Sequence, residues 1–371
     1  MVLSRRGFLY GTVTLPAIAA QKPPDRPNIL MIVAEGLPSW AIGCYGNREI
    51  RTPHIDRFAQ MGTRFSHHFA ATPDPAVNRA VLFTGRTPMQ LKDSADLSAE
   101  ISIGKLLESQ GYSSSVANHE EAVRFLDAPP AGKPFFLTVN LPALRHPYTG
   151  AAQKYADLYT QTRFDTVNPE GAGAVETLRS AASAITSLDE QVQALTAKVI
   201  ERKLLDHTMV LLVSTSGDNL SHHGHWGTGG SYYEEALNTP MILVWPGRVP
   251  AQAARPELVS SYDLLPTLAD LLAIEPPARN LCGRSYALLA TGKPLPKKEP
   301  WRATVFARSR TGGMARINRY KVILHEGAPG ELYALIADPG EKVNQFENPQ
   351  FLTVRNGLTS EWEAWKRRFS A

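Results

Sequence analysis

Cysteines and long apolar runs are both scarce in this chain of 371 residues. Only Cys44 and Cys282 are present, which excludes a small scaffold held together by several disulfides, and the sequence leaves open whether the two pair. Beyond residue 20, no segment approaches the roughly eighteen uninterrupted apolar residues that a membrane span needs. We therefore expect no stable membrane span in the mature protein.

An excess of charge of one sign is also missing. The formal net charge is +4, and the lysines and arginines are scattered rather than gathered into a basic block, so binding to nucleic acid is not indicated. With 43% hydrophobic and 20% charged residues, the composition is that of an ordinary globular protein with a large core. The sequence contains no internal repeat and does not indicate an oligomeric state.

The N-terminal segment has a composition of its own. Arg5 and Arg6 precede an apolar stretch over residues 8–20 that ends in small residues, which is the layout of a twin-arginine export signal. A membrane anchor is the alternative, but the apolar run is short for a span and Pro16 interrupts it. We predict export by the twin-arginine pathway, to the periplasm or the extracellular space.

Apolar runs of strand length alternate with helical segments in the remainder of the chain. We expect strands over residues 28–34, 112–117, 135–141, 209–213 and 241–245, and helices over residues 55–61, 101–110, 180–202 and 263–272. Continuous apolarity is typical of strands covered on both faces, so we predict an α/β fold with a large, mostly parallel central sheet flanked by helices. Its site is expected in the loops at the carboxyl ends of the strands.

The sequence pattern changes after residue 300, where short runs of alternating apolar and polar residues precede a segment with Trp362 and Trp365. We predict a small C-terminal antiparallel sheet and a terminal helix. The predicted organisation is a signal peptide over residues 1–20, a linker over residues 21–27, an α/β domain over residues 28–300 and a C-terminal subdomain over residues 301–371.

Several short motifs occur in a fixed order from residue 26 to beyond residue 341. They are Arg26-Pro27-Asn28, Gly43-Cys44-Tyr45-Gly46, Thr52-Pro53-His54, Leu188-Asp189-Glu190, His223-Gly224, Trp245-Pro246-Gly247 and Asp338-Pro339-Gly340-Glu341. Taken together, the chain resembles the sulfatases of the alkaline phosphatase superfamily. This resemblance implies an alkaline-phosphatase-like sandwich and, in active members, cleavage of sulfate esters by formylglycine and calcium.

The nucleophile motif of the family is altered in this chain. Formylglycine forms from the first residue of a Cys/Ser-x-Pro-x-Arg core, and the matching stretch is Pro75-Ala76-Val77-Asn78-Arg79. Proline carries neither a thiol nor a hydroxyl, so a covalent mechanism cannot start from Pro75. An ordinary active sulfatase is a third interpretation, which requires that a residue other than Pro75 is converted to formylglycine.

The calcium ligands that the resemblance implies are also depleted. The family has two acidic residues after the first strand and an Asp-Asn or Asp-His pair after a later one, and the matching residues are Glu35-Gly36 and Thr215-Ser216. Calcium prefers about six to eight oxygens with sufficient negative charge, so we expect a degraded site and no cofactor. A gap of one residue would instead bring Asp218-Asn219 into the ligand position.

Only some of the charged groups expected around the ester match the family. In place of the Lys-x-His pair of the family the chain has His119-Glu120-Glu121, and the carboxylate of Glu121 would repel a sulfate. In place of a second lysine the chain has Thr228. Arg79 and His146 match the family, the latter as a vestigial catalytic residue. Arg79 either pairs with Glu35 or is available, with His119 and His146, to bind an anion.

Two functional hypotheses follow from these residues. The leading one is an exported sulfatase-like protein without formylglycine and calcium chemistry that binds an anionic small molecule or glycan, sulfated or phosphorylated. The alternative is a hydrolase of sulfate or phosphate esters that holds zinc or another divalent metal at a rebuilt site of Glu35, His119, Glu121 and His146. Among the carboxylates, the candidate metal ligands are Glu35, Glu121 and, with the one-residue gap, Asp218. The histidines at 222, 223 and 225 match no zinc motif, which favours a solvated or hydrogen-bonded role.

Overall fold

The structure is a computed structural model that describes residues 26–165, 167, 169, 173–277 and 280–370. The predicted signal peptide and most of the predicted linker lie outside the described residues. Within the described ranges, no helix combines the length and the apolarity that crossing a bilayer requires.

The main sheet of the described chain follows the order β3-β4-β1-β5-β7-β2-β6, with β8 paired to β2. Its strands are β1 (Asn28–Ala34), β2 (Thr63–Phe69), β3 (Ser113–Asn118), β4 (Phe135–Asn140), β5 (Thr208–Ser214), β6 (Asn238–Thr239), β7 (Met241–Val244) and β8 (Ala253–Ser260). The four neighbours β3, β4, β1 and β5 are mutually parallel, whereas β7 runs antiparallel to β5 and β2. The carboxyl ends of those four strands therefore meet at one edge.

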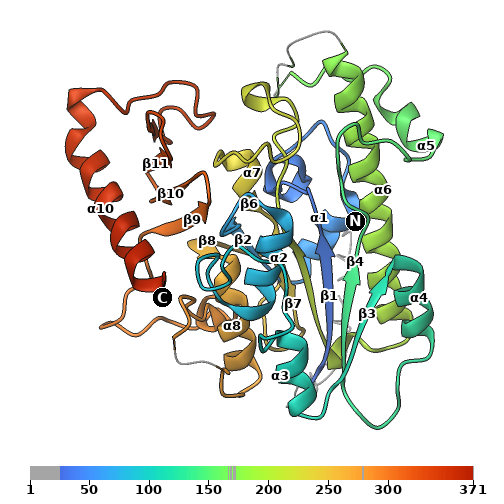
Figure 1. Ribbon diagram of the computed structural model, residues 1–371. Helices are drawn as coiled ribbons and strands as arrows, with labels where there is room; N and C mark the ends of the chain where they lie inside the picture. Colours follow the sequence, from blue (N-terminus) through green and yellow to red (C-terminus); the bar gives the residue numbers. More distant parts are fainter. Residues whose placement is uncertain (1–25, 166, 168, 170–172, 278–279, 371) are drawn as a thin grey trace, which may run out of the picture.

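Helices cover both faces of the sheet, as the continuous apolarity of the strands predicts (Figure 1). One face carries α1 (Pro53–Gln60), α4 (His119–Asp127) and α6 (Ala174–Glu201). The other carries α2 (Pro75–Thr84), α3 (Ile103–Ser109), α8 (Leu264–Leu271) and α9 (Ala287–Ala290). Alternate residues of β1 point to the two cores, so that Leu30 packs in the first and Met31 in the second. The short helices α5 (Gln153–Ala156) and α7 (Glu234–Leu237) lie in connections.

The C-terminal subdomain has the predicted antiparallel sheet and terminal helix. Its strands β9 (Val305–Ser309), β10 (Gly312–Arg316), β11 (Tyr320–His325) and β12 (Glu331–Ala334) pair in sequence order, and α10 (Leu352–Phe369) packs on them. Trp362 on α10 lies so close to β10 that a Cβ at Gly313 would stand 2.3 Å from its indole nitrogen. This close approach requires glycine at position 313.

The two cysteines are free thiols. Cys44 packs against the core under α1 and α6, whereas Cys282 packs against the cluster around α10 and accepts a hydrogen bond from Trp365 at 3.0 Å. Burial raises the pKa of each thiol to about 12, so both remain protonated. In this structure they do not pair and act as small buried side chains.

Candidate functional site

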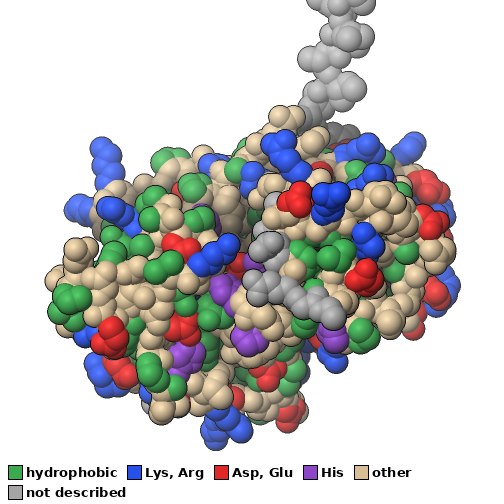
Figure 2. All heavy atoms as spheres, turned by 90° about the horizontal axis from the view of Figure 1, so that it is seen from above, with side chains coloured by type: hydrophobic (Ala, Val, Ile, Leu, Met, Phe, Trp, Pro, Cys, Tyr) green, Lys and Arg blue, Asp and Glu red, His purple; other side chains and the backbone are tan. Residues whose placement is uncertain are grey.

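A pocket of about 390 Å³ lies at the carboxyl ends of β1, β4 and β5, and we call it the strand-end pocket. Figure 2 looks onto this edge of the molecule and shows histidine side chains near acidic and basic ones around the middle of the face. The lining residues are Glu35, Gly36, Asp74, Pro75, Ala76, Leu144, Arg145, His146, Ser216, Gly217, Asp218, Gly227 and Thr228. The sheet thus brings together Glu35, His146 and the residues after β5, as their positions after parallel strands predict.

Pro75 is the first residue of α2, at the rim of this pocket. Proline suits the first position of a helix, because its fixed φ is helical and its missing N–H would have no partner there. The preceding Asp74 caps the helix, and its Oδ1 accepts hydrogen bonds from the main-chain nitrogens of Ala76 (2.9 Å) and Val77 (3.1 Å). The residue expected at the nucleophile position is therefore a helix start without a thiol or hydroxyl.

The hydroxyls at the expected metal-ligand positions after β5 bind the protein backbone. Ser216 Oγ accepts a hydrogen bond from the main-chain nitrogen of Gly36 at 3.0 Å, and Ser214 Oγ donates to the carbonyl of Ser216 at 2.7 Å. Thr215 is 1% exposed, and both its hydroxyl (3.5 Å) and its main-chain nitrogen (3.0 Å) donate to the carbonyl of Ala34. These bonds join the ends of β1 and β5 directly, where the family resemblance places an ion between them.

Gly36, at the expected position of the second acidic ligand, leaves no space for a side chain. Its φ is +80°, and a Cβ built on it would lie 2.3 Å from the carbonyl oxygen of Leu144. The loop after β4 is held there by a hydrogen bond from the Leu144 nitrogen to the Glu35 carbonyl at 2.9 Å. The backbone has therefore closed over the position of the missing carboxylate.

Glu35 lies within electrostatic reach of two arginines. Its Oε1 accepts hydrogen bonds from Nε of Arg145 at 3.0 Å and from Nη2 of the same side chain. Arg79 instead donates to Oδ1 of Asn140 at 2.7 Å and lies over the ring of Phe83. Burial lowers the pKa of Arg79, and the carboxylate of Glu35 opposes that shift. Of the two interpretations of Arg79, the ion pair with Glu35 is not found, because Glu35 pairs with Arg145 and Arg79 with Asn140.

Asp218 is buried at the base of the pocket and is held by Tyr148. The phenol of Tyr148 donates to its Oδ2 at 2.6 Å, and the main-chain nitrogen of Leu220 donates to Oδ1 at 2.8 Å. Burial raises the pKa of Asp218 to about 6. At the mouth of the pocket, the exposed His146 lies 5.5 Å from the ring of Trp226.

The other two predicted members of the rebuilt metal site lie elsewhere. His119 begins α4 and lines a separate cavity of about 920 Å³ beside α6, where burial lowers its pKa. Glu121 forms a capping box, because its Oε2 accepts from the Asn118 nitrogen at 2.9 Å while Asn118 Oδ1 accepts from the Glu121 nitrogen at 3.0 Å. The convergence expected of Glu35, His119, Glu121 and His146 does not occur.

Sequence reasoning missed two residues that organise the site. Asn78 is fully buried on α2, donates to the carbonyl of Thr215 at 2.7 Å and accepts from the Ala71 nitrogen at 2.9 Å. Tyr148 is the donor to Asp218, and no local pattern marks it. The box formed by Asn118 and Glu121 has the Asn-x-x-Glu spacing of a helix start, a signal that was available in the sequence.

Comparison with known proteins decides the family. The sulfatase family model matches residues 27–119 and 114–274, and a model of the C-terminal region of N-sulphoglucosamine sulphohydrolase matches residues 223–368. The chain belongs to the sulfatase family. Arylsulfatase A of Bos taurus is 27% identical over 76% of this chain and 71% of its own length. A Δ4,5-hexuronate-2-O-sulfatase of Bacteroides thetaiotaomicron is 23% identical over 91% and 88%, respectively.

Solved structures share the fold of this sulfatase family member at low sequence identity. A protein in complex with its substrate D-glucosamine-2-N,6-O-disulfate superposes with a TM-score of 0.80 at 17% identity and covers 93% of this chain and 98% of its own. A phosphonate monoester hydrolase of Agrobacterium radiobacter gives a TM-score of 0.78 at 17% identity, with 93% and 96% covered. The alkaline-phosphatase-like sandwich predicted from the motifs is thereby confirmed.

Proposed function

We propose that this member of the sulfatase family has lost formylglycine- and calcium-dependent ester hydrolysis and binds a sulfated or phosphorylated glycan without cleaving it. The observation that carries the first half is Pro75 at the start of α2, where Asp74 satisfies the first main-chain donors of the helix. A nucleophilic mechanism needs a thiol, a hydroxyl or a product of one at that position. The backbone there is arranged for a helix cap instead.

The loss of calcium is supported by the packing at Gly36. A carboxylate side chain at this position requires both a left-handed backbone and displacement of the Leu144 carbonyl. Ser216 is likewise engaged with the Gly36 nitrogen. A hard cation prefers several charged oxygens, and these residues offer neutral groups that already have partners.

Ligand binding is supported by the two arginines near Glu35. Arg145 pairs with Glu35, and Arg79 lies within electrostatic reach of the same carboxylate. The other two carboxylates of the lining are engaged within the protein, Asp74 by the start of α2 and Asp218 by Tyr148. The side chain of Arg145 is 74% exposed, and exposed ion pairs contribute only about 0–1 kcal/mol, so an anionic group can displace Glu35 at little cost. His146 and Trp226 offer aromatic faces beside it for a sugar ring.

The chemistry of the relatives favours a sulfated sugar as the first ligand to test. The hexuronate sulfatase and the protein solved with D-glucosamine-2-N,6-O-disulfate are both named for sulfated sugars. We propose the same ligand class here, bound by the charge of Arg145 and Arg79. The alternative hydrolase with a rebuilt metal site finds no geometric support, because His119 lines a different cavity and Glu121 is engaged in the cap of α4.

Purified mature protein tests both halves of the proposal. Mass spectrometry is expected to show an unmodified chain, and metal analysis no stoichiometric calcium. Sulfated and phosphorylated sugars are expected to give no turnover. Calorimetric titration with a sulfated disaccharide should show binding that is weakened at least about tenfold in Arg145→Ala or by removal of the sulfate, a loss of about 1.4 kcal/mol.

Arg202→Ala is the matched control, because Arg202 is also an exposed arginine in an ion pair but lies at the C-terminal end of α4, with Asp127. Turnover of a sulfate ester together with bound calcium would refute the loss of activity. Equal affinity for the sulfated and the desulfated sugar would refute the role of the arginines.

Export belongs to the same proposal and has its own test. When the full chain is expressed in a bacterium with a twin-arginine pathway, we expect a periplasmic protein whose N-terminus lies near residue 20 or 21. Replacement of Arg5 and Arg6 by lysine should retain the chain in the cytoplasm. Export that is unaffected by the double replacement would exclude the twin-arginine route.

A further inference from the structure

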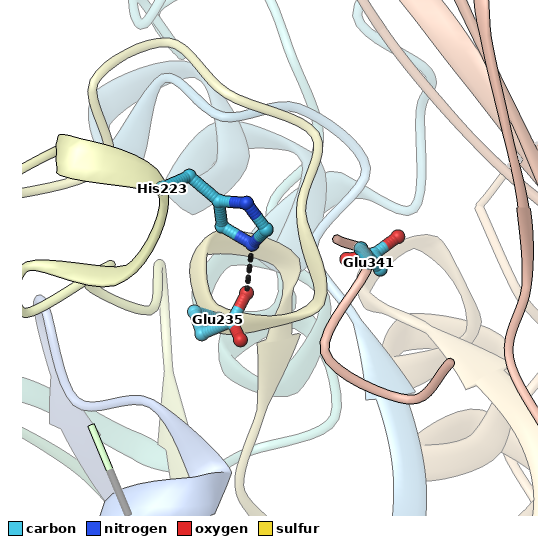
Figure 3. Close-up of side chains that lie close together, drawn as sticks. All are labelled: His223, Glu235 and Glu341. Atoms are coloured by element: carbon cyan, nitrogen blue, oxygen red, sulfur yellow. Dashed lines mark ion pairs between the residues drawn. The ribbon is translucent and has the colours of Figure 1, made fainter. Parts of the chain in front are cut away.

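A second cluster of ionisable side chains lies at the junction between the main sheet and the C-terminal subdomain, outside the lining of the strand-end pocket. It consists of His223 from the turn His222–Gly224, Glu235 from α7, and Glu341 from the turn after β12 (Figure 3). Three separate segments of the chain thus contribute one side chain each. One potential ligand atom from each residue lies within 4.8 Å of the others.

The geometry of His223 and Glu235 is that of two groups that face each other without a hydrogen bond. Nε2 of His223 lies 3.5 Å from Oε2 of Glu235. Both atoms are buried and have no hydrogen-bond partner, and the Glu235 residue as a whole is only 8% exposed. Two ligands about 2.0–2.1 Å from a tetrahedral zinc ion stand about 3.3 Å apart, close to the observed separation.

Charge around the cluster is not balanced by the protein. The carboxylates of Glu234, Glu235 and Glu341 face two cations, Arg316 and Lys321. Lys321 is fully buried and pairs with Glu234 at 3.0 Å and with Glu341 at 2.5 Å, and Arg316 pairs with Glu234 at 3.3 Å. No arginine or lysine within the described residues forms an ion pair with Glu235. The carboxylate of Glu235 therefore lies beside the imidazole of His223 without a lysine or arginine partner.

Glu341 retains acceptor capacity despite its protein partners. Its Oε1 faces Lys321, and its Oε2 accepts a hydrogen bond from the main-chain nitrogen of Glu234 at 2.7 Å. An ionised carboxylate has about four lone-pair sites, so two remain.

The ring of His223 is held in place by stacking. Its centroid lies 3.7 Å from that of Tyr233 with an interplanar angle of 11°. Tyr233 is itself held, because its hydroxyl donates to Glu331 on β12 at 3.0 Å. A cavity of about 500 Å³ adjoins the cluster and gives solvent access. A metal site needs such a fixed imidazole and an entry path.

We propose that His223, Glu235 and Glu341 form a divalent-cation site of the zinc type, with water from the adjoining cavity as the fourth ligand. One imidazole nitrogen and two carboxylate oxygens are a ligand set that suits zinc. The ion would balance the surplus negative charge and join the turn at residues 222–224, α7 and the C-terminal subdomain. The site is independent of the proposed glycan binding.

The histidine spacing alone could not indicate this site, because His222 and His225 are not ligands. Nδ1 of His222 is engaged with the Asn219 carbonyl at 2.8 Å, and His225 is exposed. The two carboxylates come from distant parts of the chain. Only the packing of the C-terminal subdomain against α7 assembles the set.

The test is a calorimetric titration of zinc chloride into the mature, tag-free chain after removal of metals with a chelator. We expect one zinc ion per chain and a melting temperature that rises with zinc. Glu235→Gln, which keeps the shape of the side chain, and His223→Ala should each weaken binding at least about tenfold. His225→Ala, a histidine of the same loop outside the cluster, should bind as the wild type does.

Circular dichroism and thermal melting of each metal-free variant establish that it is folded. If a folded wild-type chain takes up no zinc, the proposal is wrong. It is equally wrong if zinc binds with undiminished affinity to both His223→Ala and Glu235→Gln, because the ion is then held elsewhere, for example near Asp218.

Discussion

Tyr148 donates its phenol to the carboxylate of Asp218 at 2.6 Å, and this bond fixes a buried acid beneath the strand-end pocket. Asp218 has a pKa of about 6 in the folded chain because burial disfavours its charge, against about 3.9 in an unfolded chain. The folded state therefore binds this proton more tightly. Its contribution to stability is present at low pH and is lost as the pH rises from about 4 to about 6.

Tyr148→Phe should destabilise the chain by about 1–3 kcal/mol at neutral pH, because the ionised carboxylate loses its best donor. The pKa of Asp218 should rise further, so the loss of stability continues above pH 6. Urea unfolding at a series of pH values measures both effects. Tyr112→Phe is the control, because the buried hydroxyl of Tyr112 has no hydrogen-bond partner. An equal cost at low and neutral pH would argue against this account of Asp218.

Ser216→Ala should destabilise the chain by about 1–3 kcal/mol, because the buried nitrogen of Gly36 loses its acceptor. The direct link between the ends of β1 and β5 is weakened at the same time. Equilibrium unfolding in urea measures the change, and faster hydrogen exchange at the Gly36 amide locates it. Ser109→Ala, at an exposed helix end, should stay within about 0.5 kcal/mol of the wild type. No difference between the two variants would show that the Gly36 bond contributes nothing.

The fold was predictable where the sequence pattern has one physical cause. β1, β4 and β5 are buried on both faces and read as continuous apolar runs, so their residues alone indicated them. β2 and β8 were missed, because Thr63–Phe69 and Ala253–Ser260 mix polar and apolar side chains and are only partly buried. The reversed direction of β7 is set by its neighbours and leaves no trace in its composition.

The site was predictable to the extent that strand order determines it. Glu35, His146 and Asp218 follow adjacent parallel strands and line one pocket. His119 follows β3 at the edge of the sheet and starts α4 immediately, so its side chain lies toward α6. Glu35 pairs with Arg145, and Arg79 pairs with Asn140, instead of the two pairing with each other. Which of several nearby partners a side chain takes is decided by side-chain geometry and cannot be predicted from the sequence.

Gly36→Ala should destabilise the chain by more than its backbone conformation alone explains. The added Cβ combines a left-handed φ of +80° with a contact of 2.3 Å to the Leu144 carbonyl. Gly132→Ala is a matched control, because Gly132 has a φ of +81° and nothing within 4 Å of the added atom. Backbone strain of this kind costs about 1–3 kcal/mol and applies to both variants. Thermal or urea unfolding should show a clearly larger loss of stability for Gly36→Ala than for Gly132→Ala. Equal losses would mean that the loop after β4 moves aside at little cost.

Lys321→Met should destabilise the chain by about 3–5 kcal/mol, because it leaves Glu341 without its cation inside the protein. Lys154→Met is the control, since the pair of Lys154 with Glu190 at 2.7 Å has a lysine side chain that is 61% exposed and should contribute only about 0–1 kcal/mol. Urea unfolding in buffer with a chelator keeps the comparison free of metal effects. Burial raises the pKa of Glu341 to about 8, so the cost of Lys321→Met should be smaller below that pH, where protonation relieves the unpaired charge, and should grow above it. A cost that is the same at all pH values would indicate that Glu341 is uncharged in the wild-type chain.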